Sequence, residues 1–415
     1  MEPGGPAESA CATENVGYDF VRFGLIVYIG TPIAILGVLC NCVLFRLFSK
    51  ARSRRSPTLY LLILATFDLL MDLFYVPFFT VDALAIYGEN VMLHEIWHTY
   101  AIFLYGAGKL VQFASTYIVL CATIERFIVV AEIHSLDFLV SERGRYCTIG
   151  VVLFGVFLLR LPAFFEYTIE YLPKCAAFQN YEFKPLLSSE DNYRIYNFYV
   201  MTVLHIFVPF ALLLLLNISI VAVTKKKLRH IGWAATTFID MPKITELIRK
   251  ESISSAKKRR DELRYATWTM VSIVTSYLCC NTFSLFISIM ENYFADNSLM
   301  YEPDGSSTQF YTLTSDLCSI LVALNSLLRL FIYMLCSPSI RAELIKQCPL
   351  FAIFEGNLPK HGGICCRLGL TKKPQKTTVL TTNNNNNALD DDGSYGRDYR
   401  RSLIAAGYEQ NGQML

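Results

Sequence analysis

The hydrophobic positions of this chain gather in seven long runs, separated by shorter polar segments. The runs cover residues 23–48, 58–87, 98–131, 146–167, 196–224, 264–292 and 310–335. Each reaches the roughly 20 residues that a helix needs to cross the hydrocarbon core of a bilayer. Prolines within the runs are tolerated because neighbouring membrane helices re-satisfy the freed backbone groups. The pattern predicts an all-α membrane protein, a seven-transmembrane helix bundle.

The charges between the runs predict which way the bundle faces. Basic residues follow the first run in "SKARSRRS" and fill the segment 225–264 with "TKKKLRH" and "SAKKRRDELR". The loop 293–309 carries only acidic charges, and the leader 1–22 is mostly acidic. Because basic loops stay in the cytoplasm, we predict a multi-pass protein of the plasma membrane with an extracellular N-terminus and a cytoplasmic C-terminus.

Four segments follow from the pattern. We predict an extracellular N-terminal segment at 1–22, the seven-helix domain at 23–335, a short juxtamembrane amphipathic helix at 336–355, and a disordered cytoplasmic tail at 356–415. The tail contains "NNNNN" and "DDDG", which cannot bury a core. No basic and apolar leader with a small-residue cleavage site precedes the first run, so we expect no removable signal peptide.

Composition supports a membrane protein and argues against an enzyme. Of 415 residues, 53% are hydrophobic and only 17% are charged, which is too apolar for an ordinary soluble chain. The runs contain no cluster with metal-ligand spacing, no nucleophile elbow and no Gly-rich phosphate loop. We therefore expect no enzymatic activity, cofactor, metal or nucleic-acid partner.

The thirteen cysteines divide according to the predicted orientation. Only Cys11 and Cys175 lie on the oxidising side, where a disulfide can form. They are candidates for a bridge, with two free thiols as the alternative. Cys348, Cys365 and Cys366 follow the last run and are candidates for reversible acylation or plain thiols.

Polar and proline positions within the runs narrow the class. Asp68 lies in the second run, nine residues before Pro77, and an acid-Arg-aromatic triplet closes the third run in "ATIERFIVV". The fifth run contains "FVPFALLLLLN", and the seventh ends with "NSLLRLFIY". Together these resemble the rhodopsin-like G-protein-coupled receptors, from roughly Val21 to Gln347. The stretches "LPAFFEY", "NYRIYNFYV" and "CCNTF" look most similar to invertebrate receptors for FMRFamide-type neuropeptides, with a nematode chemosensory branch as near neighbour.

The chain also departs from that family's pattern. No Cys stands near Ala101 to bridge the second outer loop. The sixth run has Asn281 and Phe283 in place of an aromatic switch and a kinking proline, and the seventh has Arg329 and Leu330 in place of an Asn-Pro pair. We therefore expect a straighter sixth helix and different activation mechanics.

Glu125, Arg126 and Tyr333 are the predicted residues for activation and G-protein coupling. The resemblance implies that Glu125 holds Arg126 in the resting bundle until the inner helix ends separate and Arg126 meets a heterotrimeric G protein. Asp261 and Glu262 are expected to reinforce this hold. The alternative is an arginine that reaches lipid headgroups beside a neighbouring acid.

The candidate ligand contacts are Lys109, Glu166, Glu291 and Asp316. Lys109 lies ~25 Å further out along its helix than Arg126, and its alternative is a pair with a neighbouring acid. The acids favour a cationic ligand, because an arginine can pair with a carboxylate through two hydrogen bonds. We predict a short amidated peptide with a basic residue near an aromatic C-terminus.

A polar cluster inside the membrane is predicted from helix depths of ~1.5 Å per residue. Its members are Asp68, Ser115, Asn325, Ser326 and Arg329. In rhodopsin-like receptors the matching residues commonly hold a sodium ion, but here Arg329 is itself a cation. Because an unpaired buried charge costs ~3–5 kcal/mol, we predict an Asp68–Arg329 pair that replaces sodium. The alternatives are Asp72 as the partner, or an Arg329 that reaches the cytoplasmic interface while Asp68 is neutral or water-bound.

Two classes of function stay open. The first is a peptide-activated receptor, whose basic segment 225–264 lies against a G protein and anionic membrane lipids, especially at Lys257 to Arg260. The second is a channel or transporter whose few intramembrane charges, Arg160 among them, line a path. The missing internal repeat argues against a transporter built from duplicated halves. A retinal photoreceptor would need a Lys in 310–335, which has none.

Overall fold

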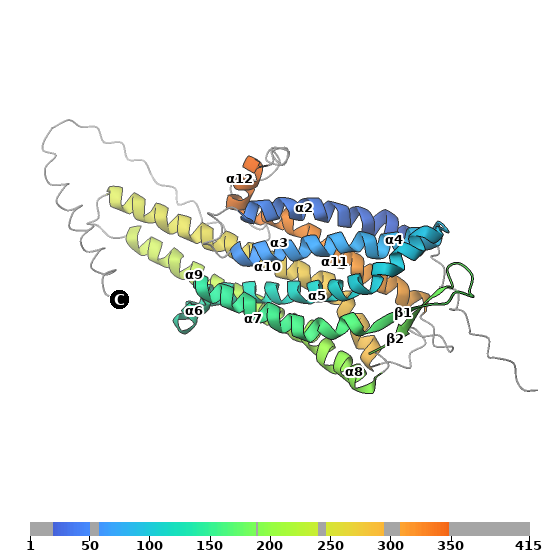
Figure 1. Ribbon diagram of the computed structural model, residues 1–415. Coiled ribbons are helices and arrows are strands. Elements are labelled where there is room, and N and C mark those ends of the chain that lie inside the picture. The colour runs from blue at the N-terminus through green and yellow to red at the C-terminus, as the bar shows by residue number, and fades with distance from the viewer. Residues whose placement is uncertain (1–19, 50–57, 188–189, 240–245, 294–307, 348–415) are drawn as a thin grey trace, which may run out of the picture. The chain divides into compact units, whose positions relative to one another are not determined.

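The computed structural model describes residues 20–49, 58–187, 190–239, 246–293 and 308–347. The described part contains seven helical segments that are long and apolar enough to span a membrane, which confirms the predicted bundle. The segments are Phe20–Ser49, Thr58–Tyr87, Val91–Ala131, Glu142–Phe165, Tyr199–His230, Arg260–Met290 and Gln309–Cys336. Figure 1 shows them packed side by side. Residues 1–19 and 348–415, including Cys11 and the predicted tail, lie outside the described residues.

Wide π-helical turns interrupt the α-helix in three of the spans. The first span joins α1 (Phe20–Phe23), η1 (Gly24–Gly30) and α2 (Thr31–Ser49), and the second joins α3 (Thr58–Tyr75), η2 (Val76–Thr80) and α4 (Val81–Tyr87). The fifth span begins within η5 (Tyr196–Met201) and continues through η6 (Val203–Phe207) into α9 (Val208–Ile239), and the short helix α8 (Asp191–Ile195) precedes it. Prolines accompany three of these turns, since Pro77 lies in η2 and Pro32 and Pro209 come two residues after the ends of η1 and η6, and proline has no N–H to donate. At the same turn as Pro77, Trp97 Nε1 and Tyr100 Oη donate hydrogen bonds to the Phe78 and Pro77 carbonyl oxygens.

The third span, α5 (Val91–Ala131), begins seven residues before the predicted start at residue 98. Asn90 caps it by accepting a hydrogen bond from the Leu93 backbone N–H at 3.1 Å, as short polar side chains do at helix starts. The polar residues of "HEIWH" placed the predicted start of the apolar run at residue 98, so hydropathy did not reveal the first turns of this helix.

The fourth span follows the short elements η3 (His134–Leu136) and α6 (Asp137–Val140). It consists of α7 (Glu142–Arg160) and the 3₁₀ turn η4 (Leu161–Phe165). The sixth span lies in α10 (Glu246–Tyr293), the seventh is α11 (Gln309–Cys336), and α12 (Pro338–Gln347) follows directly. Leu344 buries the apolar side of α12 against the core cluster that contains Leu44 and Tyr333.

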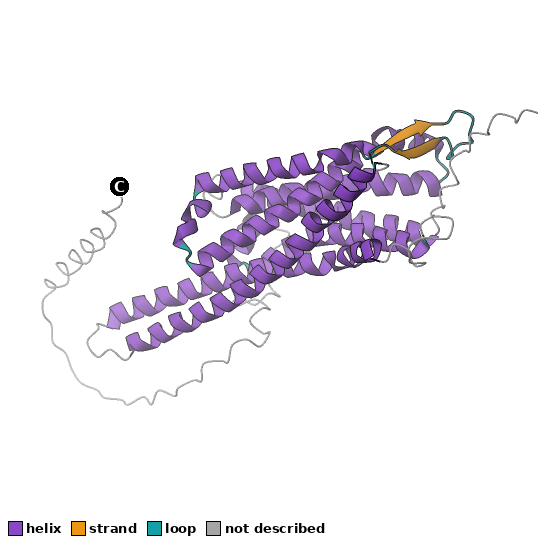
Figure 2. Cartoon of the chain, turned by 90° about the horizontal axis from the view of Figure 1, so that it is seen from below, coloured by secondary structure: helices purple, strands orange, loops and turns teal. Residues whose placement is uncertain are grey.

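The segment 225–264, expected to be a loop, is largely helical. α9 continues to Ile239 and α10 already begins at Glu246, so both helices extend past their spans, as Figure 2 shows. The sequence explains the correction, because Lys, Arg, Leu and Ala are strong helix formers even where they bury nothing. The side chain of Lys257 lies outside the described part.

A β-hairpin joins the fourth and fifth spans, and an all-α prediction did not foresee it. β1 (Tyr167–Tyr171) and β2 (Tyr181–Pro185) pair antiparallel, with Tyr171 opposite Tyr181. The hairpin packs on the first turns of α5, where the His98 and Tyr181 rings stack at 4.4 Å and 15°. Following the predicted orientation, we call the end with the hairpin the outer end.

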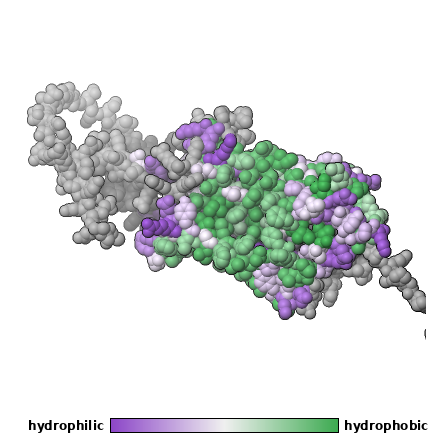
Figure 3. All heavy atoms as spheres, viewed as in Figure 1, coloured by the Kyte–Doolittle hydropathy of each residue, from purple (hydrophilic) through white to green (hydrophobic). Residues whose placement is uncertain are grey.

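Apolar side chains cover both the inside and the outside of the bundle. Buried Leu64, Ile118 and Leu213 belong to the largest core cluster, whereas Phe154 and Ile218 are 65% and 60% exposed. Figure 3 shows hydrophobic residues over most of the visible surface of the described helices, with hydrophilic residues nearer the ends. An exposed apolar belt of this kind fits a lipid environment.

Candidate functional site

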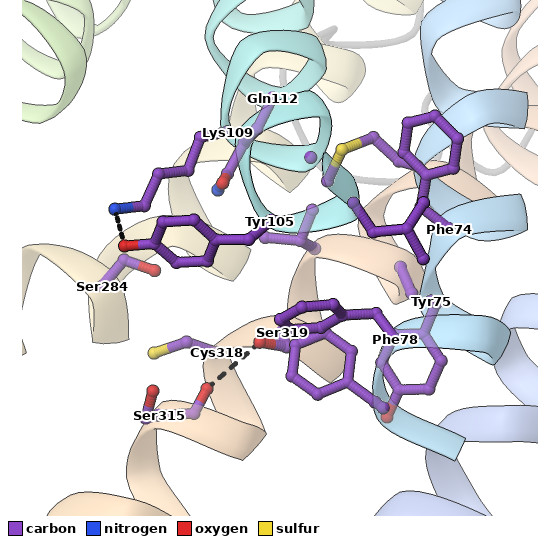
Figure 4. Close-up of a pocket in the computed structure, with 16 residues that line it drawn as sticks. Phe74, Tyr75, Phe78, Tyr105, Lys109, Gln112, Ser284, Ser315, Cys318 and Ser319 are labelled. Carbon is purple, nitrogen blue, oxygen red and sulfur yellow. Dashed lines mark hydrogen bonds between the residues drawn. The ribbon is translucent and has the colours of Figure 1, made fainter. Parts of the chain in front are cut away.

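A cavity of about 440 Å³ opens between the helices near the outer end. It lies between α3, η2, α5, α10 and α11, and most of its wall is apolar. Its lining residues are Met71, Phe74, Tyr75, Phe78, Phe79, Leu104, Tyr105, Gly108, Lys109, Gln112, Ser284, Ser315, Cys318, Ser319, Val322 and Ala323. Figure 4 shows Lys109, Gln112 and Ser284 on one side and Phe74 and Phe78 on the other. A mostly apolar cavity of this size with a few polar groups is typical of a site for a small ligand or a peptide end.

Two of the predicted ligand contacts meet at this cavity. Lys109 Nζ lies 3.0 Å from the Glu166 carboxylate, and Tyr105 Oη donates to the same oxygen at 3.0 Å. Lys109 also donates to the Tyr105 hydroxyl. Beside them, burial and the charge of Glu166 raise the pKa of Tyr193 to about 12, so its phenol stays protonated at neutral pH. The predicted alternative for Lys109, a pair with a neighbouring acid, is therefore what the structure contains.

The other two predicted ligand acids behave differently. Asp316, in the outer part of α11, accepts a hydrogen bond from Arg22 Nε at 2.7 Å. Its side chain is only 6% exposed, so in this state a ligand meets an acid that already has a cation. Glu291 belongs to the last turn of α10, and its side chain lies outside the described part.

Asp68 and Arg329 form a salt bridge deep in the bundle, between α3 and α11. Their side chains are 4% and 3% exposed, and Ser115 donates to the same carboxylate at 3.5 Å. A cavity of about 20 Å³ lies beside them, bordered by Ser115, Asn325 and Ser326, and has room for roughly one water molecule. The predicted pairing geometry is thus present, while the replacement of sodium stays a prediction.

Ser326 and Asn325 bond to neighbours other than the pair. Ser326 Oγ donates to Asp72 at 2.7 Å, and Asn41 Nδ2 donates to Asp72 at 3.1 Å. Asn325 accepts from Ser276 of α10 at 3.0 Å. Asp72, the rival partner for Arg329, is therefore held by neutral groups of α2 and α11. The five predicted members of the cluster all line the small cavity, but these hydrogen bonds divide them into three sets.

The inner end corrects the predicted hold on Arg126. The Glu125 carboxylate accepts three hydrogen bonds of 2.8–3.1 Å from Arg145 of α7. Arg126 instead donates to the Leu263 carbonyl and the Thr267 hydroxyl of α10, both at 3.3 Å. The expected contact fails because adjacent residues on a helix do not face each other, and Arg145 approaches Glu125 from another helix. Neutral groups of α10 hold Arg126 where acids had been expected.

Tyr333, the third predicted coupling residue, is buried in the core and only 1% exposed. Its ring packs edge-on against Phe48 at 5.5 Å. It reaches neither surface in this state, so a role in coupling would require movement of α11.

Sequence reasoning missed two basic residues of these sites, Arg22 and Arg145, and named Arg160 only as a charge that could line a transport path. Arg160 is 6% exposed, donates to His205 Nδ1 at 2.7 Å and lies over the Phe113 ring at 5.0 Å. A buried arginine signals a polar partner on another helix, but the sequence does not say which one. Cys175 is disulfide-bonded, and its predicted partner Cys11 lies outside the described residues, so that pairing stays a prediction.

Comparison with known proteins decides the family. The family model described as "7 transmembrane receptor (rhodopsin family)" matches residues 40–333, which include the second to sixth spans completely, most of the seventh and the end of the first. The chain belongs to the rhodopsin family of seven-transmembrane receptors. It is also 23% identical over 318 residues to a protein named FMRFamide peptide receptor frpr-18 of Caenorhabditis elegans. That match covers 75% of this chain and 66% of the relative's length.

The membership gives the geometry a context. In this rhodopsin-family receptor a mostly apolar cavity lies near the outer end, an arginine-carboxylate pair lies in the middle, and Arg126 lies at the inner end. Gln112 lines both the outer cavity and the small cavity beside Asp68 and Arg329. Met71 and Val322 also line both cavities, so the two regions adjoin across three shared side chains.

Proposed function

We propose that this receptor sits in the plasma membrane with its N-terminus outside, binds a short amidated extracellular peptide and activates a heterotrimeric G protein. The observation that carries the proposal is the cavity of about 440 Å³, with aromatic walls and the Lys109–Glu166 pair at its edge. Similarity to a protein named as an FMRFamide peptide receptor supports a peptide with a basic residue next to a C-terminal aromatic one.

The cavity suits the two ends of such a peptide. Phe74, Phe78 and Phe79 offer an apolar surface for an aromatic side chain, and ring pairs add about 0.5–1.5 kcal/mol beyond the area they bury. Gln112 and Ser284 offer donors and acceptors for a neutral terminal amide. An amide would bind here without the desolvation cost of a terminal carboxylate.

A second cation of the peptide, outside its Arg-Phe end, would meet Glu166 by exchange. Glu166 is held by Lys109 and Tyr105 in the resting state, and a guanidinium can form two parallel hydrogen bonds to a carboxylate where an ammonium forms one. Release of Lys109 would free α5 at the cavity wall. Because α5 also carries Arg126, this gives a direct mechanical route to the inner end.

At the inner end, the α10 contacts of Arg126 are neutral and long at 3.3 Å. Such bonds contribute only about 1.5–3 kcal/mol each when they involve a charged group, which peptide binding energy can offset. Separation of α5 and α10 would then expose Arg126 to the G protein.

The test is a screen of amidated peptides against cells that express the receptor, with calcium and cyclic-AMP readouts. We expect a response to peptides ending in Arg-Phe-amide and a much weaker response to the same peptides with a free C-terminal acid. Activation by a non-peptide molecule alone would contradict the proposal and favour a chemosensory receptor. A constitutive ion current through wild-type receptor, with no second-messenger response, would favour a channel.

A further inference from the structure

The first helical turn of the structure, α1, reads Phe-Val-Arg-Phe. Arg22 Nε lies 2.7 Å from Asp316 Oδ2, which joins the start of the first span to the outer part of α11. Asp316 is 6% exposed and Arg22 is 25% exposed. The chain's own arginine thus neutralises an acid that sequence analysis assigned to ligand binding.

The next residue, Phe23, is buried in an aromatic and apolar site. Its ring stacks on Tyr87 of α4 at 4.0 Å and 18°, and it packs with Ile26 and Ala83. Phe20 and Val21, in contrast, are 73% and 58% exposed. Within this tetrapeptide, only the Arg-Phe half makes the described ion pair and a buried ring contact.

The Arg22–Phe23 site adjoins the outer cavity. Phe79 packs against the cluster that contains Phe23 and also lines the cavity. On α11, Ser315 lines the cavity and Asp316 follows it directly in the chain. The cavity wall and the packing around Phe23 therefore share the Phe79 side chain.

We propose that Arg22 and Phe23 occupy, in the resting receptor, a subsite for the Arg-Phe end of the activating peptide, and that the peptide engages Asp316 by displacing Arg22. The proposal rests on the proposed peptide-receptor function. In one-letter code the name FMRFamide spells Phe-Met-Arg-Phe with a terminal amide, and α1 differs from it only by Val21 in place of Met. The same two side chains would satisfy the same acid and the same ring.

An internal competitor lowers the apparent affinity of a free ligand without changing its contacts. A segment joined directly to the first span is present at an effective concentration on the order of millimolar. The apparent Kd rises by the inverse of the fraction of receptors in which the subsite is free. If the free fraction is about one tenth, removal of the Arg22 guanidinium strengthens peptide binding about tenfold.

The experiment measures peptide-induced thermal stabilisation of the purified full-length receptor, which needs no G protein. The probes are Phe-Met-Arg-Phe-amide and an analogue in which neutral citrulline replaces arginine. We expect Arg22→Gln to lower the half-maximal concentration of the arginine peptide about tenfold and to leave that of the citrulline analogue unchanged. Asp316→Asn, alone or combined with Arg22→Gln, should make the half-maximal concentrations of the arginine peptide and the citrulline analogue equal. Arg46→Gln, the same change at an exposed arginine of α2, is the matched control.

The proposal would be overturned if Arg22→Gln and wild-type receptor preferred the arginine peptide over the citrulline analogue to the same extent. It would also be overturned if neither receptor bound the peptides. Arg22→Lys guards against a folding defect, because it keeps a cation for Asp316 but loses the two-pronged geometry. It should give an intermediate shift, and an unchanged half-maximal concentration in both variants would also overturn the subsite. Binding that depends on Asp316 without any signalling would reject peptide activation and keep the subsite. Peptide-induced signalling that Arg22→Gln leaves unchanged would reject the subsite and keep peptide activation.

Discussion

Breaking the salt bridge between Asp68 and Arg329 should damage the receptor unequally, depending on which partner is removed. In Asp68→Asn, the guanidinium is left in a dry site and cannot release its proton. In Arg329→Asn, the remaining carboxyl can take up a proton and avoid part of the penalty. We therefore expect Asp68→Asn to be the more destabilising of the two single substitutions at neutral pH.

The magnitude follows from burial. Both side chains are at most 4% exposed, so an unpaired charge costs ~3–5 kcal/mol. The shift in Tm per kcal/mol is about 2–4 °C at 150–250 residues and becomes smaller as a chain lengthens, so for this chain of 415 residues we expect Asp68→Asn to lower Tm by several degrees. The double variant removes both charges, and its loss should be smaller than the sum of the single losses by at least ~2 kcal/mol.

The assay is a thermal-unfolding cycle of the purified receptor in sodium and in choline buffers. Ser115→Ala is the control, since it removes only a 3.5 Å hydrogen bond to the same carboxylate and should cost under ~1 kcal/mol. Sodium should stabilise Arg329→Asn, in which a carboxylate again faces the small cavity, and should leave wild-type receptor unaffected. Additive losses, or stabilisation of the wild-type receptor by sodium, would refute the reasoning.

Three further predictions concern other parts of the bundle. Gly37→Ala should destabilise the receptor by ~1–3 kcal/mol, because the new Cβ would lie 2.3 Å from a carboxylate oxygen of Asp72. Gly150→Ala has open space around its Cβ and should stabilise the receptor by up to ~1 kcal/mol. Thermal unfolding measures both changes. Arg145→Ala leaves a buried carboxylate without its cation and should cost ~3 kcal/mol and raise basal signalling, while the exposed control Arg143→Ala should do neither; equal effects would contradict the pairing. Glu166→Lys should weaken activation by an arginine-containing peptide at least tenfold, and dose-response curves that coincide with wild type would remove this acid from the ligand site.

The bundle was predictable because its dominant signal is local. Seven apolar runs mark the spans, whichever helices each one packs against. The prediction and the structure differ where polar residues belong to a helix. The stretch 94–98 near the start of α5 is polar, and its His94 and His98 pack against the hairpin, which hydropathy does not report. The basic extensions of α9 and α10 are helical through propensity rather than burial.

The site was predictable as a set of residues and less so as a set of pairs. Depth along a helix gave Asp68 and Arg329 compatible positions, because both belong to straight runs with clear ends. Rotation about the helix axis decides partners, and spacing alone does not fix it. For that reason Glu125 met Arg145 instead of its neighbour in the chain, and Asp316 met Arg22 from a segment assigned to the leader.

The most direct test of the central claim is a side-by-side comparison of wild-type and Arg126→Ala receptors at equal surface expression, treated with Phe-Met-Arg-Phe-amide and read out as nucleotide exchange on purified G protein. The account predicts peptide-dependent exchange with the wild-type receptor, unchanged peptide binding by Arg126→Ala, and loss of its exchange activity to the unstimulated level. Full exchange activity in Arg126→Ala, or wild-type receptor that no amidated peptide stimulates, would contradict it.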